Sequence, residues 1–293
     1  MLEIQGLTRH FGEIRAVEDV SFTVPAGQLT GFVGGNGAGK TTTMRMILGL
    51  LQPDAGQTLW QGAPITEQVR RRIGYMPEER GLYPKQRVLD QLTYLAELGG
   101  IARPQAVAEV RELLDRFGLG DRAKERVEKL SLGNQQRVQI IAALMGAPDA
   151  LILDEPFSGL DPMAVDSMAD LLRTHAARGI PVLFSSHQLD LVERLCDSIV
   201  ILAKGRIVAK GGVDELRNSG PRRHHLTLDT DAGWVRQFPG VHAVDVDGAQ
   251  AVIEFTAPGA DQALLREAMA RGPVYAFAPV KPPLSEIYRE VSR

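Results

Sequence analysis

The residues most able to do chemistry stand in a glycine-rich loop that reads Gly-Gly-Asn-Gly-Ala-Gly-Lys-Thr-Thr over residues 34–42. Glycines lack a Cβ atom, so successive backbone N–H groups can converge on a bound anion. A helix predicted to begin near Gly39 adds unpaired N–H groups and the positive end of its dipole. Lys40 would then bridge the β- and γ-phosphates of a nucleotide, and the Thr41 hydroxyl would ligate Mg²⁺. The alternative is a glycine-rich surface turn with a chance Lys-Thr pair. The predicted nucleotide-contacting residues of this loop are Gly34, Gly35, Asn36, Gly37, Ala38, Gly39, Lys40, Thr41 and Thr42.

Two adjacent carboxylates follow an apolar run at residues 150–153. An uninterrupted apolar run is typical of a strand buried on both faces of a parallel sheet, and functional groups gather where such strands end. Beside a phosphate-binding loop, Asp154 is predicted to hold Mg²⁺ through water, and Glu155 to polarise the water that attacks a phosphate. For an isolated acidic pair the alternative is a solvated strand end.

Two rings stand near the predicted site. His187 follows a short apolar strand at residues 181–185, where it could hydrogen-bond the γ-phosphate or serve a structural role. Phe11 precedes the loop, and its ring could stack on adenine or belong to the core. Spacing alone leaves both alternatives open for each ring.

The elements that must position these residues alternate between strands and helices. Apolar runs separated by turn signals predict antiparallel strands that lead into the strand before the loop. The expected strands cover residues 2–4, 20–24, 29–33, 58–62, 73–77, 150–153 and 181–185. Because strands and helices alternate after the loop, we expect an α/β core.

Between residues 84 and 146 the hydrophobic period changes to about 3.6, which predicts a helical subdomain inserted in a β-rich framework. Its expected helices cover residues 88–96, 104–117 and 134–144, and the apolar part of the third helix is 138–144. A further helix should begin after residues 158–161, with Asp161 as its N-cap and Pro162 in its first position.

A change of composition at residues 218–221 predicts a linker between a domain at 1–218 and a small domain at 219–293. The small domain approximates a βαββαβ unit. Its expected elements are strands at 226–228, 243–246, 251–255 and 274–278 and helices at 232–238, 261–271 and 284–291. The run Arg222-Arg223-His224-His225 could form a metal or phosphate site, but a solvated linker face is the favoured interpretation, since no further ligands stand at useful spacing.

Composition sets outer limits on function. A formal net charge of −3 gives no reason to expect a nucleic-acid partner. Cys196 is the sole cysteine, so no intrachain disulfide can form, which suits a reducing compartment. No apolar stretch is long enough to cross a bilayer, and the N-terminus lacks the pattern of a signal peptide. We therefore expect a soluble protein that reaches a membrane only through another subunit.

With these motifs in this order, the chain resembles the nucleotide-binding subunits of ABC transporters. The matching segments are the Walker A loop (34–42), the signature (130–137), the Walker B strand (151–155), the D-loop (158–161) and the switch histidine, His187. They span residues 2 to about 215, and the signature is the most specific of them because other P-loop ATPases lack it. The resemblance implies a P-loop ABC ATPase core with an antiparallel β subdomain and a helical subdomain, followed by a small α+β domain.

The resemblance also implies roles for residues outside the loop. In the family, Ser131 and the Gly133 N–H would cap the γ-phosphate held by the other subunit, so ATP joins two chains. Asp161 would lie at that seam, Glu155 and Lys40 would be catalytic with His187, and Glu78 would contact the nucleotide and its Mg²⁺. The implied cofactors are ATP and Mg²⁺, and the implied partner is a second copy of the chain.

The sequence departs from the common family pattern at two places. The signature reads Leu-Ser-Leu-Gly-Asn where Leu-Ser-Gly-Gly-Gln is commoner, although the serine and second glycine remain. Glu78 stands where the family usually has the Q-loop glutamine; it can accept from a Mg²⁺-bound water but cannot donate an amide hydrogen.

Residues 77–83 and 133–136 resemble exporter-type subunits that pair with ABC-2-type permeases, a group associated with sodium or drug efflux. Residues 282–288 resemble the small C-terminal domain that such subunits carry. We therefore expect an ATPase that drives export through a separate integral-membrane permease, at the cytoplasmic face of the membrane. The alternative is a soluble ABC ATPase acting on the ribosome or on nucleic acid. It is disfavoured because this chain has one motif set and no long coiled coil. The substrate is not encoded in this chain.

Overall fold

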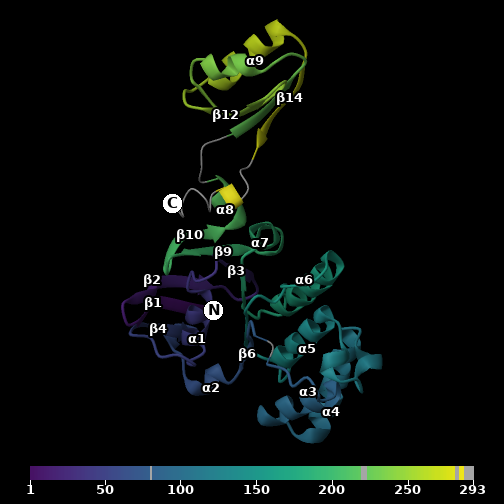
Figure 1. The fold of residues 1–293 in the computed structure, drawn as a ribbon. Coiled ribbons are helices and arrows are strands. Elements are labelled where there is room, and N and C mark those ends of the chain that lie inside the picture. The colour runs from purple at the N-terminus through teal and green to yellow at the C-terminus, as the bar shows by residue number, and fades with distance from the viewer. Residues whose placement is uncertain (80, 219–222, 281–283, 287–293) are drawn as a thin grey trace. The chain divides into compact units, whose positions relative to one another are not determined.

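The computed structural model describes residues 1–79, 81–218, 223–280 and 284–286 (Figure 1). Over these residues the chain forms two compact units that divide between Gly212 and Val213. The first unit contains two β-sheets and a group of helices, and the second contains one β-sheet with its own core. The mixed α/β architecture predicted from the sequence is confirmed.

A four-stranded antiparallel sheet opens the first unit, in the order β2-β1-β4-β5. Its strands are β1 (Leu2–Phe11), β2 (Ile14–Val24), β4 (Ala55–Trp60) and β5 (Ala63–Pro64). The sequence predicts this antiparallel start, but β1 and β2 extend beyond their apolar runs. The reason is that the hairpin end of both strands is exposed, so only the buried part carries a hydrophobic pattern.

The six-stranded sheet has the order β10-β9-β3-β8-β7-β6, and its central strands are parallel. Its strands are β3 (Leu29–Val33), β6 (Ile73–Met76), β7 (Ala150–Leu153), β8 (Val182–Ser186), β9 (Ser198–Ala203) and β10 (Arg206–Gly212). The one-turn helix α2 (Glu67–Arg70) precedes β6. The β9–β10 hairpin is an element that the sequence analysis did not predict, although residues 199–202 form an apolar run.

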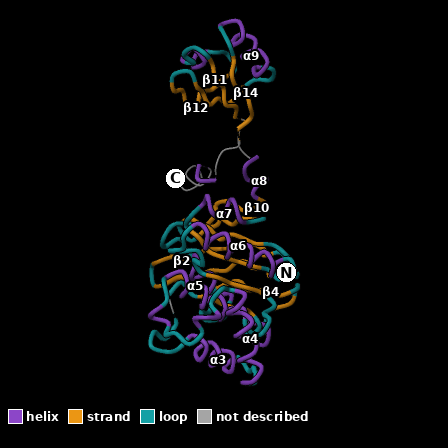
Figure 2. The backbone as a smooth tube through the Cα atoms, turned by 90° about the vertical axis from the view of Figure 1, so that its right-hand side faces the viewer, coloured by secondary structure: helices purple, strands orange, loops and turns teal. Residues whose placement is uncertain are grey.

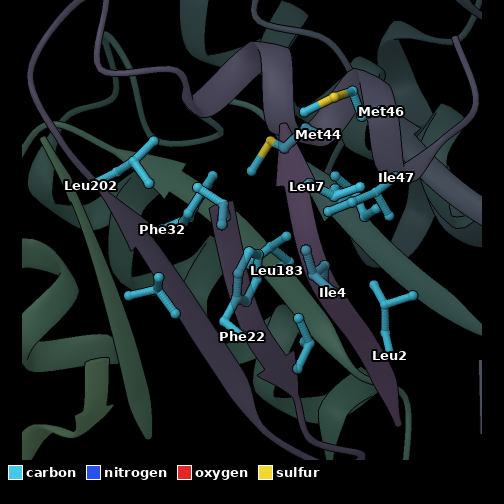
Figure 3. Packing of buried hydrophobic residues seen from close by; sticks show 14 of the residues in the cluster. Leu2, Ile4, Leu7, Phe22, Phe32, Met44, Met46, Ile47, Leu183 and Leu202 are labelled. Atoms are coloured by element: carbon cyan, nitrogen blue, oxygen red, sulfur yellow. The ribbon is translucent and has the colours of Figure 1, made fainter. Parts of the chain in front are cut away.

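The main core lies where helix α1 (Lys40–Ile47) and the antiparallel sheet meet the six-stranded sheet. Figure 3 shows Met44 and Ile47 of α1 beside Leu7 of β1. The rings of Phe22 and Phe32 stack across the two sheets with centroids 5.1 Å apart. Each fully buried side chain of this size contributes about 1.5–3 kcal/mol, and this packing holds α1 firmly at the end of β3.

Helices α6 (Pro162–Ala176) and α7 (Leu189–Leu195) also pack against β3. The approach of α7 is close: a Cβ at Gly31 would lie 2.2 Å from Val192 Cγ1 and 2.8 Å from Cys196 Sγ. Burial raises the pKa of the Cys196 thiol well above its usual value. The cysteine therefore serves as a small side chain packed against β3.

The helical subdomain contains α3 (Val88–Leu98), α4 (Arg103–Arg116) and α5 (Leu132–Leu144), with 3₁₀ turns at Gly120–Arg122 and Val127–Lys129. Figure 2 shows α3 and α4 together at the edge of the first unit, and α3 contacts both α4 and α5. Helix α5 begins at Leu132, earlier than the predicted start at Asn134. The Ser131 side chain accepts from the Asn134 N–H at 3.4 Å, and this N-cap starts the helix.

The second unit begins with α8 (Val213–Asn218) and forms an antiparallel sheet in the order β12-β13-β11-β14. Its strands are β11 (Arg223–Leu228), β12 (Val241–Asp247), β13 (Gln250–Phe255) and β14 (Val274–Val280), and its long helix is α9 (Ala260–Arg271). Residues 232–238, predicted as an α-helix, instead contain a 3₁₀ helix at Gly233–Gln237. Asp231 accepts from the Gly233 N–H at 2.7 Å, a local turn that competes with an α-helical start. The predicted linker lies mostly outside the described residues, as does the predicted last helix beyond residue 286.

The prediction of a solvated linker face at residues 222–225 is wrong for Arg223, while Arg222 lies outside the described residues. Arg223 is buried in β11, and its guanidinium is 2.6 Å from Glu254 Oε1 and 2.6 Å from Glu286 Oε2. Both carboxylates are remote in the sequence, so local charge pattern could not reveal them. Over the described residues, no group of three or more histidine, cysteine or acidic side chains is arranged to hold a metal ion.

His175 should make folding stability depend on pH. It is buried in α6, and burial, with Arg178 and Arg116 nearby, lowers its pKa from the ordinary 6.5. The unfolded chain therefore binds the proton more readily, so stability is lost as the pH falls below about 6.5. The urea midpoint should drop between pH 7.5 and pH 5.5, and His175→Gln should reduce that drop. His10→Gln, at an exposed histidine, is the control. An unchanged slope in His175→Gln would contradict the prediction.

Candidate functional site

The predicted site residues gather because three neighbouring parallel strands end at one edge of the six-stranded sheet. In the register of the sheet, Val33 of β3 pairs with Ser186 of β8, and Leu153 of β7 pairs with Phe184 of β8. The segments that follow are the glycine-rich loop after β3, the acidic pair after β7 and His187 after β8. This is the edge at which α/β sheets bind their ligands.

The glycine-rich loop turns sharply from β3 into α1, and two of its glycines are required by close approaches. Gly39 has a φ of 105° and is the N-cap of α1, and a Cβ there would lie 2.5 Å from the Ala16 carbonyl oxygen. A Cβ at Gly34 would lie 2.5 Å from the Leu202 carbonyl oxygen. The loop therefore reaches α1 with its backbone against β2 and β9, as the predicted strand–loop–helix order requires.

Lys40 lies folded back across the loop at the first position of α1. Its Nζ donates to Gly34 O at 2.8 Å and to Gly35 O at 3.4 Å, and lies 3.7 Å from Glu155 Oε1. Only 8% of the side chain is exposed. The ammonium is thus held over the loop, with Glu155 as its carboxylate partner.

Asp154 is tied to two elements by its two oxygens. Thr41 Oγ1 donates to Asp154 Oδ2 at 2.7 Å, and Ser185 Oγ donates to Asp154 Oδ1 at 2.5 Å. The Asp154 N–H donates to Met76 O at 2.8 Å. The carboxylate is buried and fully oriented, because hydrogen bonds from α1 and β8 hold it from both sides.

Glu155 has an unusual backbone and a dense set of partners. Its φ of 51° is in the left-handed region, which costs a non-glycine residue about 1–3 kcal/mol. Its N–H donates to Ser185 Oγ at 2.7 Å, and His187 Nδ1 lies 3.0 Å from Glu155 Oε2. Gln136 Nε2 donates to the Glu155 carbonyl at 3.2 Å. These contacts hold a strained residue with its carboxylate between Lys40 and His187.

A cavity of about 540 Å³ opens beside these groups. All residues from Gly35 to Thr42 line it, together with Glu155 and Glu78. Phe11 also lines the cavity and is 46% exposed at the end of β1, with the Arg9 guanidinium 5.0 Å from its ring centroid. The core alternative for Phe11 is therefore wrong, since the ring faces an opening rather than the interior.

Six predicted site residues do not line this cavity. Gly34, Asp154 and His187 are hydrogen-bonded to residues that line it, and the other three belong to the signature and the D-loop. Ser131 caps α5, and Asp161 caps α6 by accepting from the Ala164 N–H at 2.8 Å. A Cβ at Gly133 would lie 3.3 Å from Leu160 Cδ2, so the signature adjoins the D-loop of the same chain. Ser131, Gly133 and Asp161 are all described residues, and none of them lines the cavity.

Other cavity and network residues were missed by the sequence analysis. Ser185 is the hydroxyl that joins Asp154 to Glu155, and Gln136 supports the Glu155 backbone. Residues 14–16 and Lys204 line the cavity from the β1–β2 and β9–β10 hairpins. A signal existed for Ser185 alone, as the polar residue ending an apolar strand. The hairpin residues carry no local pattern that marks a ligand site.

The donor set fits Mg²⁺ bound together with a nucleotide. Thr41 Oγ1 and the Asp154 carboxylate are hard oxygen groups within 2.7 Å of each other. Mg²⁺ prefers oxygen ligands and commonly takes one or two protein groups, with phosphate and water completing its shell. Few protein ligands are therefore expected at such a site.

Comparison with known proteins agrees with this geometry. The family model "ABC transporter" matches residues 17–158, and the model "ATP-binding protein DrrA1-3-like, C-terminal domain" matches residues 211–292. The ABC transporter ATP-binding protein YhaQ of Bacillus subtilis is 39% identical over 291 residues, which cover 99% of this chain and 98% of YhaQ. The chain belongs to the ABC transporter ATP-binding proteins.

Other members of this family are named for different transport directions. The Nod factor export ATP-binding protein I of Burkholderia lata is 38% identical over 221 residues, covering 74% of this chain and 73% of that protein. The methionine import ATP-binding protein MetN of Symbiobacterium thermophilum is 34% identical over 284 residues, covering 92% of this chain and 84% of that protein.

A solved ABC transporter ATP-binding subunit matches with a TM-score of 0.67 and 34% identity, over 74% of this chain and 92% of the other. As a member of this family, the chain binds ATP. Over the described residues, none of the helices combines the length and the apolar character that a membrane span needs.

Ser185→Ala should destabilise the protein through the site network. The change leaves the Glu155 N–H without its partner and removes a donor from the buried Asp154 carboxylate, a loss of about 1–3 kcal/mol in the free energy of unfolding. Urea unfolding of the nucleotide-free protein measures it. Ser186→Ala removes a hydroxyl that accepts from the Gln188 N–H and should cost less. Equal stability of Ser185→Ala and the parent would contradict the role given to this hydroxyl.

Proposed function

We propose that this chain is the ATP-hydrolysing subunit of an ABC exporter, and that two copies drive a separate membrane permease. The observation that carries the proposal is the network at the strand ends. In this network Lys40 Nζ lies 3.7 Å from Glu155 Oε1, and His187 Nδ1 lies 3.0 Å from Glu155 Oε2. The network stands beside a cavity lined by the glycine-rich loop. This arrangement supplies a phosphate cradle, a carboxylate base and groups that orient it.

Glu155 is proposed as the general base for the attacking water. Its carboxylate borders the cavity at the phosphate end, and the proton that the water loses would go to Glu155. Lys40 would bind the phosphate oxygens, and its Nζ, 3.7 Å from Glu155 Oε1, holds that carboxylate in place. His187, whose Nδ1 lies 3.0 Å from Glu155 Oε2, would restrict the rotamer of the base and hydrogen-bond the γ-phosphate.

Thr41 and Asp154 are proposed to hold Mg²⁺, with Glu78 as a further oxygen group at the cavity wall. When bound, the ion neutralises charge on the phosphate oxygens and orients them. Ser185 keeps the Asp154 carboxylate facing Thr41, so the oxygen pair is preformed.

A second copy is proposed to complete the site. Ser131 and Gly133 stand at the N-terminus of α5, where free backbone N–H groups and the helix dipole favour an anion. They do not line the cavity of their own chain, which supports a role toward the nucleotide held by a partner copy. Asp161, beside the signature, would then lie at the seam between the copies.

Export is supported by the second unit and by the motif resemblance. Residues 211–292 match a DrrA-like C-terminal domain, and one relative is named for Nod factor export. A relative named for methionine import matches 92% of this chain, so sequence identity does not by itself set the transport direction. We propose that the subunit binds its permease at the cytoplasmic face of the membrane and that the permease selects the substrate, sodium or a drug-like compound.

Glu155→Gln should trap an ATP-bound dimer. Without the carboxylate the water loses its base, so turnover should fall by about 10²–10⁴ while the glycine-rich loop still binds ATP. Size-exclusion chromatography with excess Mg-ATP should move the variant to the dimer position. Glu112→Gln, at an exposed carboxylate on α4, is the control and should turn over ATP like the parent. A monomeric Glu155→Gln protein that binds ATP would count against the proposal.

Ser131→Arg should abolish hydrolysis and leave ATP binding intact, since Ser131 lies outside the cavity of its own chain. Lys40→Ala should be inactive because it lacks the phosphate-binding ammonium. A mixed dimer of the two variants contains one intact site, made from the loop of the first chain and the signature of the second. Mixing the two inactive proteins should therefore restore part of the ATPase rate. No recovery on mixing, with both proteins folded, would refute the shared site.

A further inference from the structure

Lys204 occupies a position in the β9–β10 hairpin that is unfavourable for a lysine. Ala203 pairs with Arg206, so Lys204 and Gly205 form a two-residue turn, and their φ values are 50° and 79°. Two-residue turns with both φ values positive favour Asn-Gly or Asp-Gly, because a longer side chain is strained in the left-handed region. A lysine here breaks the local rule, and strain of this kind concentrates at functional sites.

Two residues with strained, left-handed backbones line the cavity. Over the described residues, the non-glycine residues with positive φ are Asp19, Gln61, Ala147, Glu155 and Lys204. Of these, Glu155 and Lys204 line the cavity beside the glycine-rich loop. Glu155 is the proposed base, whereas Lys204 takes no part in the hydrolysis proposed above.

The turn is fixed to the site by its backbone. The Gly205 N–H donates to Ala38 O in the glycine-rich loop at 3.1 Å, and Gly205 O accepts from the Glu18 N–H of β2 at 2.8 Å. A Cβ at Gly205 would lie 2.9 Å from Ala16 O, so the turn fits closely between the loop and β2. Lys204 is therefore carried at a defined place, between the loop and the hairpin that bears Phe11.

Over the described residues, Lys204 is also the one cation lining the cavity that has no carboxylate partner. Among the cations that line the cavity, Lys40 pairs with Glu155, and Arg15 pairs with Glu18 at 3.2 Å. For Lys204, the described part of the chain provides neither an ion pair nor a hydrogen bond to the side chain. An exposed ammonium beside a phosphate-binding loop attracts an anion.

We propose that Lys204 is a nucleotide-contacting residue whose ammonium binds the phosphate chain near the α-phosphate. Lys40 serves the far end of that chain, beside Glu155, and Phe11 marks the base end of the cavity. The Lys204 turn adjoins Ala38 and Ala16, which lie between these ends. The inference rests on the proposed nucleotide binding and adds a contact outside the motifs that predicted it.

The test uses Lys204→Asn, which removes the ammonium and also suits the left-handed turn. Thermal unfolding without nucleotide should show equal or higher stability. Titration with a fluorescent ADP analogue should show a Kd raised about three- to tenfold, with the loss shrinking in high salt because the contact is electrostatic. Lys204→Arg keeps the charge and should bind nearly as the parent does.

Gln61→Asn is the matched control. Gln61 and Gly62 form the two-residue turn between β4 and β5, with φ values of 52° and 83°, and neither lines the nucleotide cavity. This change should leave the Kd for the analogue unaltered. A parent protein that fails to bind the analogue would refute the proposed nucleotide site itself. A Lys204→Asn protein that binds as tightly as the parent would overturn this inference alone.

Discussion

The two hydrogen bonds of the Ser185 hydroxyl are the constraint on which the site depends. This hydroxyl donates to Asp154 and accepts from the Glu155 N–H, so one side chain at the end of β8 orients both acids at the end of β7. Thr41 completes the link to α1. A buried carboxylate needs such donors, and these also align the groups that a nucleotide must meet. The parallel register of β3, β7 and β8 makes the contact possible.

Different parts of the fold position different groups around this network. The core beneath α1 holds the glycine-rich loop rigid, while the hairpins of both sheets bring Phe11 and Lys204 to the cavity. The signature and the D-loop are held against each other on the same chain, outside the cavity. This separation is the physical reason for proposing that two copies share each site. The second unit has its own hydrophobic core.

Sequence patterns predicted those elements whose information is local. The Walker A loop, the buried strand before Asp154 and the Asp161–Pro162 helix start appear as expected, because glycine spacing, apolar runs and capping act over a few residues. The β9–β10 hairpin and the 3₁₀ helix at Gly233–Gln237 were not predicted. The hairpin was missed although residues 199–202 form an apolar run, whereas a local turn at Asp231 decided the 3₁₀ helix. Arg223, predicted to be solvated, is buried because Glu254 and Glu286 come to it from distant parts of the chain.

Local patterns in the sequence identified the family and predicted the site: a phosphate-binding loop, an acidic pair after a buried strand, and a signature in family order. Each depends on residue types at fixed short spacings, which a single chain displays openly. Three further facts came from the folded chain alone: Ser185 orients the acids, Phe11 faces an opening, and Lys204 borders the cavity beside the glycine-rich loop. Those facts depend on strand register and on which hairpins meet, and long-range packing sets both.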